Sequence, residues 1–272
     1  MKIFFSSLFI IFLATALKAA PCDSPDFNAC KIDDEERVIV IDNQENVKIT
    51  NSSNMKIGSI IFTANNFNLT MKDSALDAYR FAPSNYNYKI NISMDNSQLT
   101  LRNASSVSME AVNLSNKSTL TVQGLSLLSI DDFTSTGGSE VKIKSSFGML
   151  SLKKATLEDV YMTAGFLRIQ GDVVAENIYK VDPTDPVDTT RDYTDLTAGG
   201  NIEIVNKGSL TAKKLQASQV HVISGNLTIN DAYEIGALDN KTSDDTSKND
   251  EKIVNINADG IITTINLDML KL

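Results

Sequence analysis

Short segments in which apolar and polar residues alternate recur at a nearly fixed spacing along the middle of the chain. The segments 97–101 (SQLTL), 118–122 (STLTV) and 139–143 (SEVKI) each begin with serine and start 21 residues apart. Alternation with a period of two is typical of a β-strand that buries one face. A fixed period of this length is typical of a solenoid, in which each repeat packs on the next. The pattern therefore predicts short strands stacked in coils.

A second column of alternating residues keeps step with the first. The triplets 107–109 (VSM), 128–130 (LSI) and 150–152 (LSL) follow one another at 21 and 22 residues, and a looser apolar column passes through Val112 and Phe133. Weaker copies lie at 47–49, 67–69, 90–92, 167–169, 202–204, 210–212, 220–222 and 227–229. Asparagine and glycine between the segments suit tight corners, because both tolerate positive φ. Strands are thus expected almost everywhere and helices almost nowhere.

The two columns favour an all-β fold, a right-handed parallel β-helix (β-solenoid) with coils of roughly 21 residues. Parallel stacking places equivalent side chains in rows about 4.8 Å apart, which explains why like residues recur at like positions. The hexapeptide repeat of left-handed versions is missing. An antiparallel β-sandwich is the alternative, since it also contains many short alternating strands.

The segment 1–20 has the parts of a secretory signal peptide. Lys2 provides a positive start, residues 3–13 form an apolar run, and small alanines offer cleavage positions between 16 and 20. Pro21 stands where a lipoprotein signal requires a small residue, so lipidation of Cys22 is the weaker interpretation. No later stretch approaches the roughly 20 apolar residues of a membrane helix, so no membrane span is expected. We expect a secreted, periplasmic or cell-surface protein.

The mature chain is expected to be one solenoid, residues 38–252, between two caps. Residues 21–37 hold Cys22 and Cys30, the only cysteines, and an exported chain meets oxidising conditions, so a disulfide is expected to pin an N-terminal cap. The apolar segment 253–272 is expected to cover the last coil, because an open coil end exposes unpaired backbone groups. Loop insertions are expected where the period fails, near 75–88, 182–198 and 239–252.

Acidic residues outnumber basic ones by 34 to 25, and the net charge is −9. Nucleic acids and anionic surfaces are bound by basic patches, so a nucleic-acid partner is not expected. No motif indicates a cofactor. Glycans and host or cell-surface proteins are the partners that the composition leaves open.

Three later segments carry a family resemblance. Residues 197–204 (TAGGNIEI), 208–212 (GSLTA) and 225–229 (GNLTI) resemble the β-helical repeats of filamentous haemagglutinins and autotransporter passenger domains. The resemblance implies a right-handed β-helix, export, and adhesion or display at a cell surface.

Two interruptions of the period hold candidate binding residues. Aromatic side chains gather around one arginine in the first interruption, and this combination suits sugars or protein partners; the residues are Tyr79, Arg80, Phe81, Tyr86 and Tyr88. The alternative is an aromatic lid packed over a coil. Carboxylates gather in the second interruption and could bind calcium, which prefers oxygen ligands; the residues are Asp182, Asp185, Asp188, Asp192 and Asp195. The alternative is a solvated loop.

Catalysis has less support in the sequence. His221 is the only histidine, and alternation in 220–222 (VHV) points it away from the core. Many parallel β-helices are polysaccharide lyases or hydrolases with clustered acids and bases on the outer face, a role open to Asp131, Asp132, Asp159 and Arg168. We therefore expect a non-enzymatic, surface-structural or adhesin-like binding protein, with a carbohydrate-active β-helix enzyme as the alternative. Converging acids and bases in a cleft would favour the enzyme, and ladders of Ser, Thr and Asn the scaffold.

Overall fold

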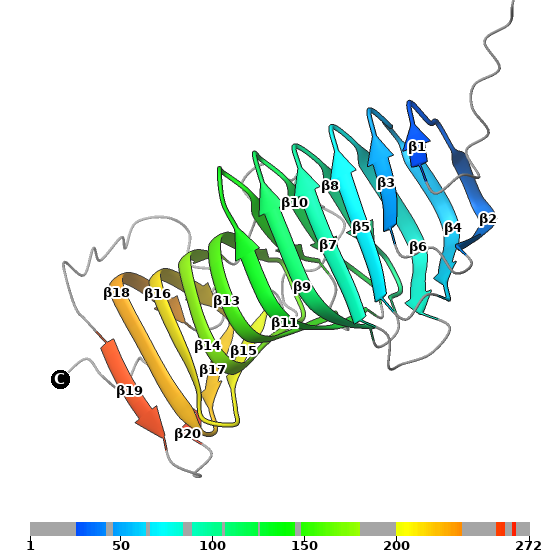
Figure 1. Ribbon diagram of the computed structural model, residues 1–272. Helices are drawn as coiled ribbons and strands as arrows, with labels where there is room; N and C mark the ends of the chain where they lie inside the picture. The colour runs from blue at the N-terminus through cyan, green and yellow to red at the C-terminus, as the bar shows by residue number, and fades with distance from the viewer. Residues whose placement is uncertain are drawn as a thin grey trace, which may run out of the picture.

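The computed structural model describes residues 26–41, 46–63, 66–83, 89–104, 107–124, 126–144, 148–179, 200–235, 254–258 and 263–264. Within these ranges every secondary-structure element is a β-strand and there is no helix. The strands wind into a continuous stack of coils (Figure 1). Three parallel sheets run along this stack.

Sheets 1, 2 and 3 are named in the order in which the chain crosses them within one coil. Sheet 1 contains β1 (Asp26–Asn28), β3 (Asn46–Thr50), β5 (Asn66–Lys72), β7 (Lys89–Asp95), the later parts of β9 (Val107–Ser115) and β11 (Leu127–Ser135), the middle of β13 (Met149–Met162) and β14 (Phe166–Tyr179), and the first parts of β16 (Gly208–Ala217) and β18 (Gly225–Ile235).

Sheet 2 contains the first parts of β2 (Asp33–Ile41), β4 (Met55–Phe62) and β6 (Ala75–Pro83), then β8 (Gln98–Leu101), β10 (Thr119–Val122) and β12 (Glu140–Ile143), and the last parts of β13, β14, β16 and β18. Sheet 3 contains the later parts of β2, β4 and β6, the first parts of β9, β11, β13 and β14, then β15 (Asn201–Ile204) and β17 (Gln219–Val222).

The register confirms the repeat that the sequence predicted. Thr119 lies opposite Gln98 on one side and Glu140 on the other, so the three segments of the first column stack directly. Leu128 likewise lies between Val107 and Leu150 in the second column. All of these pairings are parallel, and the fold is therefore a parallel β-helix and not an antiparallel sandwich.

A ladder of buried serines forms the corner between sheets 1 and 2. The backbone N–H of Ser52 donates to Ser74 Oγ at 3.1 Å, and the N–H of Ser74 donates to Ser97 Oγ at 3.2 Å. The same bond joins Ser97 to Ser118 and Ser118 to Ser139. Each hydroxyl thus satisfies a corner amide of the preceding coil, which explains why serine opens every copy of the repeated segment.

The first coil places Cys30 at the corresponding corner. Its backbone N–H donates to Ser52 Oγ at 3.0 Å, and the residue is buried. Cys22 lies outside the described residues, so the Cys22–Cys30 disulfide stays a prediction.

The core is a column of apolar side chains enclosed by the three sheets. At its N-terminal end the rings of Phe62 and Phe67 stack with their centroids 4.3 Å apart, and Phe81 packs on Phe62 at 5.1 Å. The segment 75–83, expected to begin a loop insertion, is strand β6 and pairs in parallel with β4 and β8. Tyr79 and Arg80 both point outward where β6 turns from sheet 2 to sheet 3, and this bend breaks the alternation that predicts strands.

The two ends of the stack differ. At the N-terminal end β1 and β2 already pair in parallel with β3 and β4, so the expected cap boundary at residue 37 falls within β2. At the other end β19 (Val254–Ala258) and β20 (Thr263–Thr264) pair antiparallel with β18 and β17. Both strands belong to the segment 253–272, where a C-terminal cap was expected. The insertions expected near 182–198 and 239–252 lie outside the described residues.

Candidate functional site

A hollow of about 280 Å³ lies on the outer face of sheet 3. Five polar residues and five apolar residues line it: Ser108, Ser129, Ser151, Arg168 and Gln170, and Pro83, Val107, Leu127, Leu128 and Met149. We call it the sheet-3 hollow. Its volume is close to the lower limit of about 300 Å³ for small-molecule sites.

One outer column of sheet 3 supplies most of the polar lining. Ser108, Ser129 and Ser151 lie opposite one another on β9, β11 and β13, and Arg168 follows on β14. Each of the three serines is the centre of a triplet in the second sequence column, between two side chains that point into the core. Successive strands lie about 4.8 Å apart, so the column presents evenly spaced hydroxyl groups along the stack.

Pro83 interrupts sheet 3 beside this column. The later part of β6 pairs with β4, whereas no backbone pairing joins Pro83 to β9 among the described residues. Proline lacks the N–H that a central strand donates, and it is therefore confined to strand ends and sheet edges. The hollow lies at this interruption, with Pro83 and Val107 both in its lining.

A bulge lies next to Gln170, which continues the outward positions of β14 and lines the hollow. The register between β13 and β14 shifts after Leu152, so that Lys154 pairs with Asp172. The two residues Gln170 and Gly171 therefore lie opposite the single residue Lys153. A Cβ atom on Gly171 would lie 2.1 Å from the carbonyl oxygen of Lys153, so only glycine fits. The extra residue of a bulge bends its strand, and this bend directly follows Gln170 at the sheet-3 hollow.

Arg168 is held by an ion pair with the next coil. Its Nε and Nη2 atoms donate to Glu203 Oε2 at 2.9 and 2.7 Å. The two side chains are 36% and 20% exposed. Glu203 therefore fixes the guanidinium beside the hollow and balances its charge.

Two buried polar atoms on this sheet have no hydrogen-bond partner in the described part of the chain. Ser151 is only 6% exposed, and its Oγ atom is one of them. Asn201 Oδ1, on the neighbouring outer column beside Phe166, is the other. An unsatisfied buried polar group is costly and uncommon, so it calls for an explanation such as strain, a bound water or ion, or a functional role.

His221 lies next to Glu203 in the outer column, one coil further along the stack, and does not line the hollow. As the alternation predicted, its neighbours Val220 and Val222 are buried and the imidazole lies on the outer face. Its Nε2 atom lies 3.1 Å from Gln219 Oε1.

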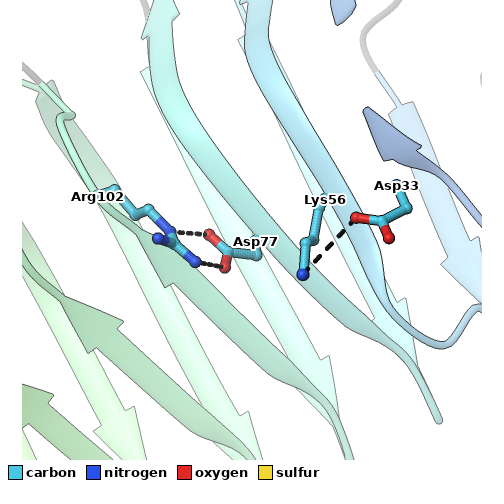
Figure 2. Close-up of polar contacts among 4 residues, drawn as sticks. All are labelled: Asp33, Lys56, Asp77 and Arg102. Atoms are coloured by element: carbon cyan, nitrogen blue, oxygen red, sulfur yellow. Dashed lines mark hydrogen bonds and ion pairs between the residues drawn. The ribbon is translucent and has the colours of Figure 1, made fainter. Parts of the chain in front are cut away.

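Elsewhere on the outer faces, opposite charges pair between neighbouring coils. Figure 2 shows Lys56 on β4 beside Asp33 on β2, and Arg102, which directly follows β8, beside Asp77 on β6. The Lys56 Nζ atom lies 3.6 Å from Asp33 Oδ1. The hydrogen bond to the Asp77 carboxylate raises the pKa of Arg102 above its usual value. Further pairs are Lys89–Glu110, Lys153–Asp131 and Lys154–Asp132, at 2.7, 2.7 and 2.8 Å.

The four residues considered for carbohydrate chemistry are not brought together. Asp131 lies at the bend between sheets 3 and 1, Asp132 begins the sheet-1 part of β11, and both pair with lysines. Asp159 lies on sheet 2, where it accepts a hydrogen bond from Asn177 Nδ2 at 2.7 Å. Arg168 lies on sheet 3. These positions do not form one catalytic cluster.

The predicted aromatic group is divided by the fold. Tyr79 is 55% exposed and Arg80 is exposed on the outer side of the coil, but Phe81 is 0% exposed and belongs to the core. Phe81 therefore cannot contact a ligand at the surface. Tyr86 and Tyr88 lie outside the described residues.

The five aspartates proposed for calcium, from Asp182 to Asp195, also lie outside the described residues. In the part of the chain that the structure describes, no group of three or more His, Cys, Asp or Glu side chains is placed to hold a metal ion. The described residues also contain no helix long and apolar enough to cross a membrane.

The local sequence signal of the hollow is the serine at the centre of each second-column triplet. The contributions of Pro83, Leu127, Met149 and Gln170 had no such signal. The fold and the hollow together define the class of this protein, a parallel β-solenoid with polar outer columns and a lined hollow on sheet 3. Comparisons with protein-family models, curated proteins and solved structures found no match.

Proposed function

We propose that this protein is an exported, non-enzymatic β-solenoid that acts as a surface-structural or adhesin-like binding protein. The observation that carries the proposal is the pairing of outer-face charges between coils. Lys56, Arg102 and Arg168 each face one carboxylate of a neighbouring coil. Charges used in this way brace the stack and are not free for acid–base chemistry.

Polar ladders on sheet 1 support the same proposal. Asn68 Nδ2 donates to Asn46 Oδ1 at 3.1 Å, and Asn91 Nδ2 donates to Asn68 Oδ1 at 3.1 Å. The next outer column of this sheet continues through Thr70, Ser93, Asn113, Thr134 and Thr156. Regular hydroxyl and amide columns offer hydrogen bonds to a partner without a reactive centre. The signal-peptide pattern of residues 1–20 supports export.

A glycan array followed by a depolymerisation assay tests the proposal. We expect the purified protein to bind one or more surface glycans, or a cell-surface protein, and to release no new reducing ends or unsaturated products from the glycans. Formation of such products would refute the proposal. Failure to bind every glycan and every surface-protein preparation would also refute it.

The alternative, a carbohydrate-active enzyme, is favoured by one observation. Arg168, Glu203 and His221 are successive members of the outer column that lines the hollow. An acid and a base on one column are the groups that glycosidic bond cleavage requires, if they flank the bond. Product formation that disappears in Glu203→Gln would establish this alternative.

A further inference from the structure

We propose that the sheet-3 hollow binds a sugar unit of a neutral, hydroxyl-rich glycan. This inference rests on the proposed binding function and identifies its site and ligand class. Three properties of the hollow support it: an unsatisfied buried hydroxyl, an apolar wall, and a cation whose charge is already balanced.

The polar side of the hollow matches sugar hydroxyl groups. Ser151 Oγ lacks a hydrogen-bond partner although the residue is only 6% exposed, and Ser129 and Gln170 line the same hollow. Serine hydroxyls and the glutamine amide each donate and accept, as sugar hydroxyls do. A bound sugar hydroxyl would give Ser151 the partner that the protein does not supply.

The outer column next to the serines is apolar, since Leu127 on β11 pairs with Met149 on β13. Leu127 is 44% exposed at the edge of the hollow, and Met149 and Pro83 extend the same wall. Binding sites typically combine an apolar surface with a few placed polar groups. A pyranose ring has both chemical faces, with C–H groups above and below the ring and hydroxyls around it.

The charges of the site favour a neutral glycan over an acidic one. Arg168 contacts Glu203 Oε2 through two nitrogen atoms, so an anionic ligand would meet the carboxylate together with the guanidinium. The whole chain carries a formal charge of −9, which repels polyanions at long range. The remaining N–H groups of Arg168 can still donate to neutral hydroxyls.

Titration calorimetry with chosen oligosaccharides tests the inference. The probes are maltohexaose, cellohexaose and mannohexaose as neutral glycans, and polygalacturonate as an acidic one. The variants are Ser151→Ala, which removes the hydroxyl, and Leu127→Asp, which places a charge on the apolar wall. Ser53→Ala, at an exposed serine that does not line the hollow, is the matched control.

We expect at least one neutral hexaose to bind and polygalacturonate not to bind. Ser151→Ala and Leu127→Asp should each weaken binding about tenfold, the size of one lost hydrogen bond or contact, and Ser53→Ala should bind like the parent protein. The melting temperature of Ser151→Ala should stay level or rise, because the change removes an unsatisfied buried hydroxyl. A structural role for Ser151 would lower the melting temperature instead.

Three outcomes would overturn the inference. Neutral binding that both hollow variants leave unchanged would move the site elsewhere while the proposed function stands. Tighter binding of polygalacturonate would refute the neutral ligand class. Absence of binding to all three hexaoses would refute the ligand class too, and the proposed function would then stand or fall separately on the glycan array and the surface-protein preparations.

Discussion

The carboxylate of Glu158 accepts a hydrogen bond from the backbone N–H of Ser139 at 2.9 Å. It also accepts from Gly137 and Gly138, at 3.0 and 2.7 Å. In the preceding coils the hydroxyl of the next serine in the ladder accepts this corner amide, as Ser139 does for Ser118. Strand β13 runs through the corner without such a serine, so one carboxylate ends the ladder.

Glu158→Ala should destabilise the fold by about 1–2 kcal/mol, because it leaves the Ser139 amide partly buried without an acceptor while water reaches the two exposed glycine amides. Glu158→Gln keeps an acceptor oxygen and should cost less. Urea unfolding of the two variants and the parent protein measures both effects. Equal stability of all three would show that the carboxylate does not support this corner.

Ser97→Ala should destabilise the fold by about 1–3 kcal/mol. The change removes the acceptor of the buried Ser74 amide and the donor to the Asp95 carbonyl oxygen, at 3.2 and 2.8 Å. Ser93→Ala, four residues earlier and exposed on sheet 1, should change stability by less than about 0.5 kcal/mol. Chemical denaturation of the pair checks the prediction, and similar values for both variants would contradict a structural serine ladder.

Most of the fold could be predicted, because every coil of a solenoid buries side chains at the same positions and so repeats one pattern. The triplets around Ser108, Ser129 and Ser151 stack as their spacing indicated. The prediction was wrong where a strand bends: Tyr79 and Arg80 point outward together at the bend of β6, and their succession resembles a loop in sequence.

The hollow could not be predicted, because it depends on relations between coils. Pro83 matters only because it ends its part of sheet 3 beside Val107, and Gln170 only because the stacked strands bring it to the same hollow as the serine column. The partner of Arg168 lies 35 residues later in the chain, well beyond the usual period, so its pairing with Glu203 has no signal in local spacing.

Phe81→Ala should destabilise the fold by about 3–5 kcal/mol, the usual cost of removing a buried aromatic ring. Phe81 is 0% exposed and packs against Phe62 and Phe67. Tyr79→Ala should change stability by less than about 0.5 kcal/mol, because the side chain is exposed. Thermal unfolding of the two variants measures both effects. A mild effect of Phe81→Ala would show that this ring does not belong to the packed core.

Tyr179 should make the fold less stable in alkaline solution. Burial, and secondarily the nearby charge of Asp159, raise the pKa of the Tyr179 hydroxyl above its usual value. Below the ordinary tyrosine pKa of about 10 the Tyr179 hydroxyl keeps its proton in both the folded and the unfolded chain, so its ionisation does not change the stability of the fold. As the pH rises past this value the unfolded chain ionises first, and the stability of the fold therefore falls until the raised pKa is reached.

Urea midpoints of the parent protein and Tyr179→Phe from about pH 8 to about pH 11 measure this effect. The difference in stability between the two proteins should shift in favour of Tyr179→Phe across the upper part of that range, and phenolate absorbance assigned to Tyr179 should rise later than that of a free tyrosine. Asp159→Asn should recover only part of the shift, because burial against Tyr161, stacked at 5.3 Å, is the larger cause. Complete recovery in Asp159→Asn would instead make charge the dominant cause, and a constant difference between the parent protein and Tyr179→Phe would contradict the raised pKa.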